Sequence, residues 1–204
     1  GLWSNAAATP ILAEQDRGIR ELYMKGTIAA HVGRQEWKTG GDIAVGTVRE
    51  RFGYQLTDVS QFDSGTHATF NFAGQRADRE QALFVQDQIR LGPWTVNAGL
   101  RWDHYQLVAD ESAVSPRLGV AWAWPAADLV LRASYDRAFQ TPAVENILLA
   151  SSPTVEALND HVVRLPVLPS WGNFYEGAIS KALGGSVRVD ASYFDRTMNN
   201  FADD

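Results

Sequence analysis

The side chains best suited to chemistry are four histidines, and their spacing forms no known site. They are His31, His67, His104 and His161, scattered along the chain. The sequence has no HExxH motif and no histidine pair at i and i+4, so it offers no helical zinc site. The GxSxG motif, the GxGxxG motif and the Walker A loop are also missing from the sequence. From the spacing of the histidines and the missing motifs, we therefore expect neither a metal site nor a nucleotide site.

A second candidate is a group of carboxylates near one expected loop. Asp103, Asp110 and Glu111 could bind a cation or a substrate, but oxygen-ligand sites normally draw on a denser cluster of acids. The ordinary interpretation is that these residues are solvated. The sequence contains no cysteine, which excludes disulfides, thiolate zinc sites and cysteine nucleophiles. We predict that the chain is not an enzyme and holds no cofactor.

Composition narrows the class of protein further. The 204 residues carry a formal net charge of −6, which argues against a nucleic-acid partner because such proteins normally present a basic face. The apolar runs are too short for a transmembrane helix, and the first residues do not resemble a signal peptide. Seven Trp, six Tyr and nine Phe beside 17 Gly favour strands and tight turns.

Alternation of apolar and polar residues with period two predicts about eight strands. The pattern is clearest in 94–108, where Trp94 to Trp102 place every second, apolar side chain on one face. The other expected strands are 20–33, 37–56, 79–91, 117–124, 129–136, 174–183 and 187–193. The sequence thus predicts an all-β fold.

The connections between these strands alternate in length. Short turns are expected at 34–36, 92–93, 125–127 and 184–185, and longer loops at 57–78, 109–114 and 140–172. Such an antiparallel up-and-down meander is typical of part of a larger transmembrane β-barrel with short periplasmic turns. Aromatic side chains near the short turns are expected at the membrane interface, namely Trp37, Trp94, Trp122 and Trp124. A soluble β-sandwich that stacks such aromatics on sugars, a carbohydrate-binding module, is the alternative.

The longest loop, 140–172, contains one expected helix. Thr141 is placed as the N-cap and Pro142 as the first helical residue of a helix that continues through Ala143–Ala150. Three further prolines argue against another long element in this loop. A loop of this size is usually functional or mobile.

Several of these segments also resemble one protein family. Phe84–Arg90 (FVQDQIR) followed by Leu91–Asp103 (LGPWTVNAGLRWD) resembles the barrel of TonB-dependent outer-membrane receptors, where an FVQD strand precedes a GLRYD strand. Ser115–Val120 (SPRLGV) and Leu131–Pro142 (LRASYDRAFQTP) are similar to the strands that follow in that family. Glu36–Asp42 is similar to an upstream strand start, although Gln35 stands where a His is common.

The resemblance covers about residues 18 to 200, and it extends to a subgroup. Glu176-Gly177 and Ala191–Phe194 look like the next hairpin of the family. Glu145–Ser152 looks like large receptors from soil bacteria that also carry an N-terminal carboxypeptidase-regulatory-like domain. The resemblance implies a protein of the bacterial outer membrane that imports a scarce solute, such as a siderophore, cobalamin, an oligosaccharide or a peptide. It also implies energy supplied by TonB through a plug domain.

The sequence departs from the family in extent. Large receptors of this type have 22 strands around a plug, whereas residues 1–204 supply about eight strands, no plug segment, no TonB box and no closing strand. We therefore expect an interior fragment of a barrel, whose partners are outer-membrane lipid, the remainder of its own barrel and plug, TonB through that plug, and a small solute. A small complete eight-stranded outer-membrane barrel is the alternative.

Site residues follow from the strand order. Candidates for solute contact lie near the long loops or on the expected helix, and they are Asp103, Tyr105, Asp136, Phe139, Glu145 and Asn146. Charges expected to face the barrel lumen are Arg101, Arg117, Arg132, Arg188 and Asp190. These inward charges could contact solute, or could form cross-strand ladders or hold a plug, and the sequence leaves both interpretations open.

Overall fold

The computed structural model describes all residues except 1, 4–10, 63–65, 143–146, 154–167 and 201–204. Its main feature is one antiparallel sheet in which each strand pairs with the next along the chain, in the order β1 to β9. Eight strands are long and β1 (Leu2–Trp3) has two residues. The long strands are β2 (Ile11–Val32), β3 (Gln35–Leu56), β4 (Thr69–Leu91), β5 (Trp94–Gln106), β6 (Asp110–Trp124), β7 (Leu129–Gln140), β8 (Ser170–Leu183) and β9 (Val187–Asn199).

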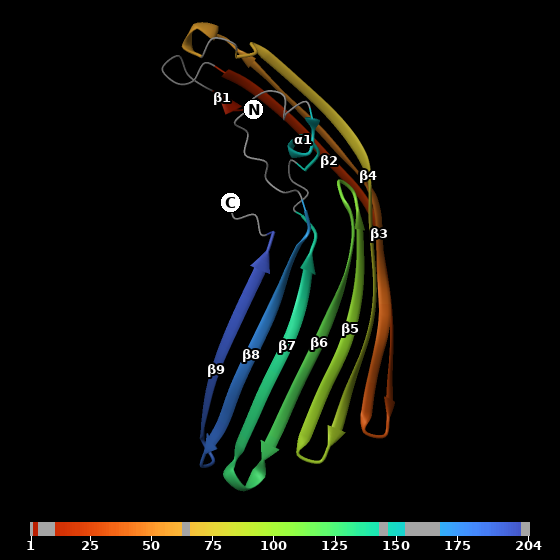
Figure 1. Ribbon diagram of the computed structural model, residues 1–204, viewed down its shortest axis with the longest axis vertical. Coiled ribbons are helices and arrows are strands. Elements are labelled where there is room, and N and C mark those ends of the chain that lie inside the picture. The colour runs from red at the N-terminus through yellow and green to blue at the C-terminus, as the bar shows by residue number, and fades with distance from the viewer. Residues whose placement is uncertain (1, 4–10, 63–65, 143–146, 154–167, 201–204) are drawn as a thin grey trace.

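Tight turns gather at one end of the sheet, called here the turn end (bottom of Figure 1). Gly33, Gly92 and Gly184 adopt φ values of 62°, 60° and 67° in the β2–β3, β4–β5 and β8–β9 turns, a region where glycine has no Cβ penalty. The β6–β7 turn is a short 3₁₀ helix, Pro125–Ala127, that ends at Asp128 with φ 50°. The turns predicted at 92–93, 125–127 and 184–185 are confirmed, and the turn predicted at 34–36 lies slightly earlier, at 33–34.

The opposite, or loop, end differs from the sequence prediction because the strands are longer than expected. β4 begins at Thr69 rather than near residue 79, and only Leu107–Ala109 separate β5 from β6. β7 and β8 shorten the longest loop to residues 141–169. The added parts of these strands carry polar side chains on the outer face, such as Gln75 of β4 and Asp110 and Ser112 of β6, so no apolar outer face reveals them in the sequence.

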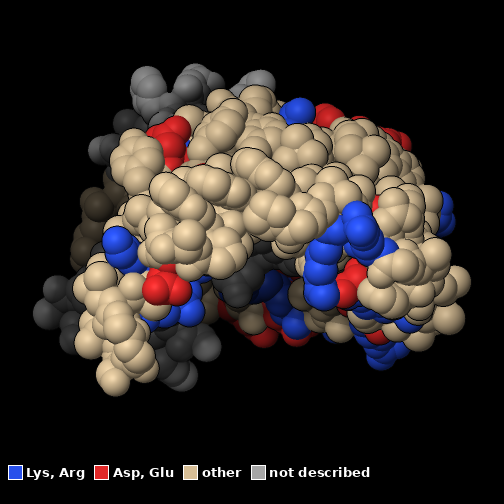
Figure 2. Space-filling view, turned by 90° about the horizontal axis from the view of Figure 1, so that it is seen from below, with Lys and Arg blue, Asp and Glu red and all other residues tan. Residues whose placement is uncertain are grey.

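The sheet is a single curved layer that forms part of a barrel wall (Figures 1 and 2). No second sheet packs on it in the described part of the chain, so the β-sandwich alternative is wrong. The strand order is linear and β9 does not pair with β1 or β2, so the small closed barrel is also not formed by these residues. Among the described helices, none is long and apolar enough to cross a membrane.

A short helix, α1 (Ile147–Ala150), lies on the concave side of the sheet near the tops of β3 and β4 (Figure 1). The Leu149 N–H donates a hydrogen bond of 2.9 Å to Oε2 of Glu50, which is 1% exposed. Leu148 packs with Val48, Tyr105 and Leu107 in the main buried apolar cluster. The α1 contacts therefore identify the face of β3 that carries Val48 and Glu50 as the inner, concave face.

The strand register identifies the inner face of the other strands too, because directly paired residues point to the same side of a sheet. Val48 pairs with Arg76, and the same face of β4 carries Glu80, which pairs with Tyr105 of β5. The outer face of β5 then carries Trp94, Val96, Ala98, Leu100 and Trp102, the apolar set found in the sequence.

One glycine marks a close approach between β2 and β3. A Cβ added at Gly46 would collide with the carbonyl oxygen of Arg20, whereas one added at Gly177 would meet nothing within 4 Å. We expect Gly46→Ala to lower the free energy of unfolding by about 1–3 kcal/mol through overpacking, and Gly177→Ala to leave it unchanged or raised. Urea midpoints of the two variants test this, and equal midpoints would contradict the close approach.

Candidate functional site

The inner face carries a ladder of ion pairs, some within a strand, some between neighbouring strands and one that reaches over β4 from β5 to β3. Arg101 of β5 contacts Asp42 of β3 at 3.3 Å and Asp103 of its own strand at 2.7 Å. One step along the sheet, the Nε atom of Arg117 lies 3.4 Å from Oδ1 of Asp136. Cross-strand pairs of this kind stabilise a sheet and fix its register.

The ladder continues on β7, β8 and β9 around one hydroxyl group. Arg132 donates a hydrogen bond of 2.7 Å to Oγ of Ser180, and the Ser180 hydroxyl donates to the carboxylate of Asp190. Arg188 contacts the same carboxylate at 3.0 Å. All five charges expected to face the lumen therefore lie on the inner face.

Three of the residues predicted to contact solute lie close together near the loop end. Asp103 and Phe139 line an inner cavity of about 250 Å³ together with Asp42, Glu80 and Thr141. Tyr105 is 2% exposed beneath α1 and packs in the apolar cluster, so its ring offers little free surface.

The other predicted solute contacts lie apart or cannot be placed. Asp136 is paired with Arg117 farther along the sheet, outside the cavity. Glu145 and Asn146 lie outside the described residues, as does the first part of the expected helix 143–150. The described part of that helix, α1, begins at Ile147.

Sequence reasoning missed two acids of this region: Asp78 because residues 57–78 were assigned to a loop, and Glu80 although it lies in the expected strand 79–91. Asp78 is 6% exposed, and its Oδ1 atom has no hydrogen-bond partner in the described structure. Glu80 accepts a hydrogen bond from the side chain of Thr141, which comes from the β7–β8 loop. Glu50, which holds α1, was missed too, since a lone Glu in a strand carries no signal of a partner 99 residues away.

Asp78 and Glu80 lie beyond the Leu83–Trp102 pair toward the loop end, outside the outer apolar band described below. Burial raises the pKa of Asp78, and the nearby charge of Glu21 raises it further. Burial likewise raises the pKa of Glu80, with Asp78 as the next cause. Both carboxylates therefore lie in an environment that disfavours their negative charge.

Aromatic rings line the same inner face near the loop end. Phe52 and Tyr54 of β3 pair with Phe72 and Phe70 of β4, and the Tyr54 and Phe70 ring centroids are 5.8 Å apart. The sequence analysis missed this cluster, although residues 52, 54, 70 and 72 follow the period-two rule. Its two β4 members fall in the segment that had been assigned to a loop.

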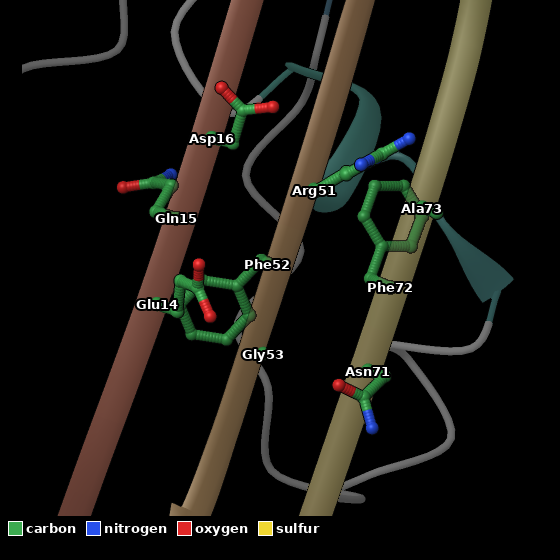
Figure 3. Close-up of a pocket in the computed structure, with 9 residues that line it drawn as sticks. All are labelled: Glu14, Gln15, Asp16, Arg51, Phe52, Gly53, Asn71, Phe72 and Ala73. Carbon is green, nitrogen blue, oxygen red and sulfur yellow. The ribbon is translucent and has the colours of Figure 1, made fainter. Parts of the chain in front are cut away.

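A second cavity, of about 750 Å³, lies at the loop ends of β2, β3 and β4 (Figure 3). Its lining draws on both faces, since Phe52 and Phe72 are inner residues whereas Glu14, Asp16 and Arg51 alternate with the inner set. None of the residues predicted from the sequence to contact solute lines it.

The described histidines form no catalytic or metal site. His104 approaches Ser112 at 2.9 Å and Asp110 at 3.8 Å, but both contacts use the same ring atom, Nδ1, so the three residues are not a triad. Asp110 lies on the outer face while Asp103 and Glu111 lie on the inner face. No group of three His, Asp or Glu that could hold a metal is found among the described residues.

The convex outer face carries an exposed apolar band. Figure 2, seen from the turn end, shows an almost uncharged convex surface and charged side chains gathered in the hollow. Soluble monomers rarely expose so continuous an apolar surface. Exposed members of the band on the paired outer positions are Leu22, Met24, Ile28, Ile43, Val45, Leu83, Val85, Leu100, Val114, Leu118, Val120, Leu131, Ile179, Val189 and Tyr193.

Aromatic rings border this band at the turn end. Trp94 stacks on Trp122, and Trp122 on Trp124, with ring centroids 5.7 Å apart in each pair. Trp37 lies two residues after the β2–β3 turn and is 43% exposed. All four predicted interface tryptophans therefore lie on the outer face near the turns.

A second set of aromatic residues lies on the outer face toward the loop end. Trp102 follows Trp94 by eight residues, about 27 Å along the strand. Tyr135 and Tyr175 pair on the same face, with ring centroids 5.0 Å apart. A strand tilt of about 35–45° reduces this distance to a height of roughly 19–22 Å, slightly less than the apolar band of about 25 Å typical of outer-membrane barrels.

Comparison with known proteins agrees with this architecture. Residues 8–204 match the family model "TonB dependent receptor-like, beta-barrel". A search of curated proteins finds no match. Among solved structures, the copper transporter OprC superposes with a TM-score of 0.64 at 14% identity, over 92% of this chain and 30% of that one.

Two further structures give the same result. The ferric enterobactin receptor PfeA of Pseudomonas aeruginosa, as its G324V mutant, superposes with a TM-score of 0.61 at 19% identity, over 89% of this chain and 27% of that one. The ferric citrate transporter FecA gives 0.53 at 16% identity, over 93% and 28%. This chain thus spans less than a third of each neighbour, and these are receptors and transporters rather than enzymes. The chain belongs to the TonB-dependent receptor family of outer-membrane β-barrels.

Proposed function

We propose that this chain forms part of the wall of an outer-membrane receptor that imports a small, scarce solute. The observation that carries the proposal is the two-faced curved sheet, with an apolar band outside and an ion-pair ladder inside. The band would meet lipid, and the tryptophans at the turn end would lie at the membrane interface.

The remainder of the barrel would pair with the open edges of this sheet. β9 has no neighbour on its outer side among the described residues, and an unpaired strand edge is prohibitive in lipid. We expect further strands of the same receptor to cover these edges, and a plug to occupy the hollow. TonB would act through that plug, as the family implies.

The solute would enter over the inner cavity near the loop end. Asp103 and Phe139 line that cavity, and we propose that they contact the solute together with Glu80 and Thr141. Tyr105 and Asp136 would support the site from beneath α1 and through Arg117. The solute classes remain those implied by the family: a siderophore complex, cobalamin, an oligosaccharide or a peptide.

An uptake assay tests the proposed import function. The receptor that contains these residues is produced in a bacterial strain without other TonB-dependent receptors, with and without TonB. Radiolabelled ferric siderophores, cyanocobalamin, maltooligosaccharides and short peptides are supplied. We expect at least one probe to accumulate only when both the receptor and TonB are present. Equal accumulation without TonB, or accumulation of no probe, would contradict the proposal.

A further inference from the structure

The inner face holds a concentration of acids near the loop end that the ion-pair ladder neutralises only in part. We call it the acidic recess, made of Asp42, Asp78, Glu80 and Asp103. Register places all four on the inner face of β3, β4 and β5: Asp42 pairs with Ala82, which pairs with Asp103, and Glu80 pairs with Tyr105.

Among the described residues, Arg101 supplies the guanidinium group that contacts acids of the recess, while Arg117 acts on Asp103 electrostatically. Arg101 donates to both Asp42 and Asp103, so its hydrogen bonds are shared between two of the four acids. Among the other basic side chains on this face, Lys25 pairs in register with Asp42, Arg76 with Val48, and Arg117 contacts Asp136. Within the described residues, no ion pair links any of them to Asp78 or Glu80. The recess therefore has an excess of negative charge.

A buried carboxylate oxygen gives an independent sign of a missing partner. Asp78 is 6% exposed and its Oδ1 atom has no hydrogen-bond partner in the described structure. Burying a carboxylate oxygen without a partner is costly, and native structures avoid it. The charge of Asp78 also raises the pKa of Glu80 and of the Tyr105 hydroxyl, so Asp78 adds negative charge close to both groups.

The recess is open to the hollow of the sheet through the 250 Å³ cavity. Asp42, Glu80 and Asp103 line this cavity, and Phe139 and Thr141 complete its wall. Its volume is several times that of a water molecule, about 30 Å³, so a small organic cation fits. The Phe139 ring offers an apolar wall against which a cation can pack.

We propose that the acidic recess binds an ammonium or guanidinium group of the imported solute. The inference rests on the import function proposed above and adds to it a substrate class, a cationic solute such as a basic peptide. The bound cation would be shared among the carboxylates of Glu80, Asp103 and Asp42, with Asp78 contributing charge from behind. An organic cation is favoured over a free metal ion since the described residues hold no cluster with metal-ligand geometry.

The test compares two ligands that differ in charge and little in shape. N-acetyl-arginine amide and its neutral analogue, N-acetyl-citrulline amide, are titrated into the purified receptor that contains this chain. We expect the arginine compound to bind at least about tenfold more tightly, because hydrogen bonds between charged groups are roughly twice as strong as neutral ones. Equal affinities would overturn the inference.

Variants locate the binding to the recess. Glu80→Gln and Asp78→Asn should each weaken binding of the arginine compound about tenfold while leaving the citrulline compound unchanged. Glu176→Gln is the matched control, an inner acid on β8 that is outside the recess. Because burial disfavours the charge of Asp78 and Glu80, neither amide should lower the unfolding temperature. Unchanged affinity in both folded variants would overturn the inference.

Two further results separate the alternatives. Mn²⁺ or Ca²⁺ is titrated alone, and tight binding that is lost in Glu80→Gln would overturn the organic-cation inference in favour of a metal. If a probe is taken up in a TonB-dependent way but the arginine and citrulline compounds bind equally, this inference is overturned and the import function stands. Discrimination without any TonB-dependent uptake would instead leave the recess intact as a cation site and count against the import function.

Discussion

Replacing Leu118 by arginine is expected to destabilise the membrane-inserted barrel by about 2–4 kcal/mol, the cost of arginine at the lipid-facing midplane. Leu118 is 54% exposed on the outer face. It pairs with Ala98, which lies halfway between Trp94 and Trp102. The expected result is a lower urea midpoint in lipid vesicles and a smaller inserted fraction in the outer membrane.

The matched control for Leu118→Arg is Asn97→Arg. Asn97 is also exposed and lies opposite Gly119, the residue that follows Leu118, but it points to the inner face. An added charge there would enter water rather than lipid, so we expect little change in stability. Equal destabilisation by the two substitutions would mean that the two faces do not differ in environment.

Replacing Leu148 by alanine is expected to release α1 from the inner face. Leu148 is 4% exposed and packs on Val48, Tyr105 and Leu107. Truncating a buried leucine costs about 2–5 kcal/mol, and most of it should fall on docking of the loop since the strands do not depend on α1. We expect hydrogen exchange at the Leu149 amide, which is bonded to Glu50, to accelerate by at least about tenfold.

Leu168→Ala is the control in the same loop. Leu168 is 43% exposed, so its truncation should change stability by no more than about 0.5 kcal/mol. It should also leave exchange at the Leu149 amide unchanged. Similar acceleration in both variants would show that the buried packing of Leu148 does not hold α1 in place.

The part of the fold that borders the apolar band could be predicted from sequence. In β5, strict alternation from Trp94 to Trp102 gives both the strand and the side on which each residue lies. Gly33, Gly92 and Gly184 mark turns because they occupy backbone conformations that favour glycine. The charged residues that alternate with this apolar set, such as Arg101, lie on the inner face by register.

The loop-end parts of the strands could not be predicted in this way. Beyond the band the outer face of residues 69–78 carries no large apolar side chain, so the apolar alternation there is limited to the inner pair Phe70 and Phe72, which is too short to reveal a strand. The contacts within the candidate site could not be predicted from local sequence pattern either. Asp42 meets Arg101, 59 residues away, and Glu50 meets Leu149, 99 residues away, and such contacts depend on register rather than on local pattern.

The central claim is that one face of this sheet meets lipid and the other meets water. The 204 residues contain no cysteine, so single cysteines carrying a nitroxide label can be introduced without a background in this segment. Labels are placed along β5 at Val96, Asn97, Ala98, Gly99, Leu100 and Arg101, in the receptor reconstituted in lipid vesicles. The accessibility of each label is measured as the enhancement of its spin relaxation by collision with a second paramagnetic agent. Enhancement by oxygen, which concentrates in lipid, should be strong at 96, 98 and 100. Enhancement by a water-soluble nickel chelate should be strong at 97, 99 and 101. Uniform accessibility to either agent along the strand would contradict the account.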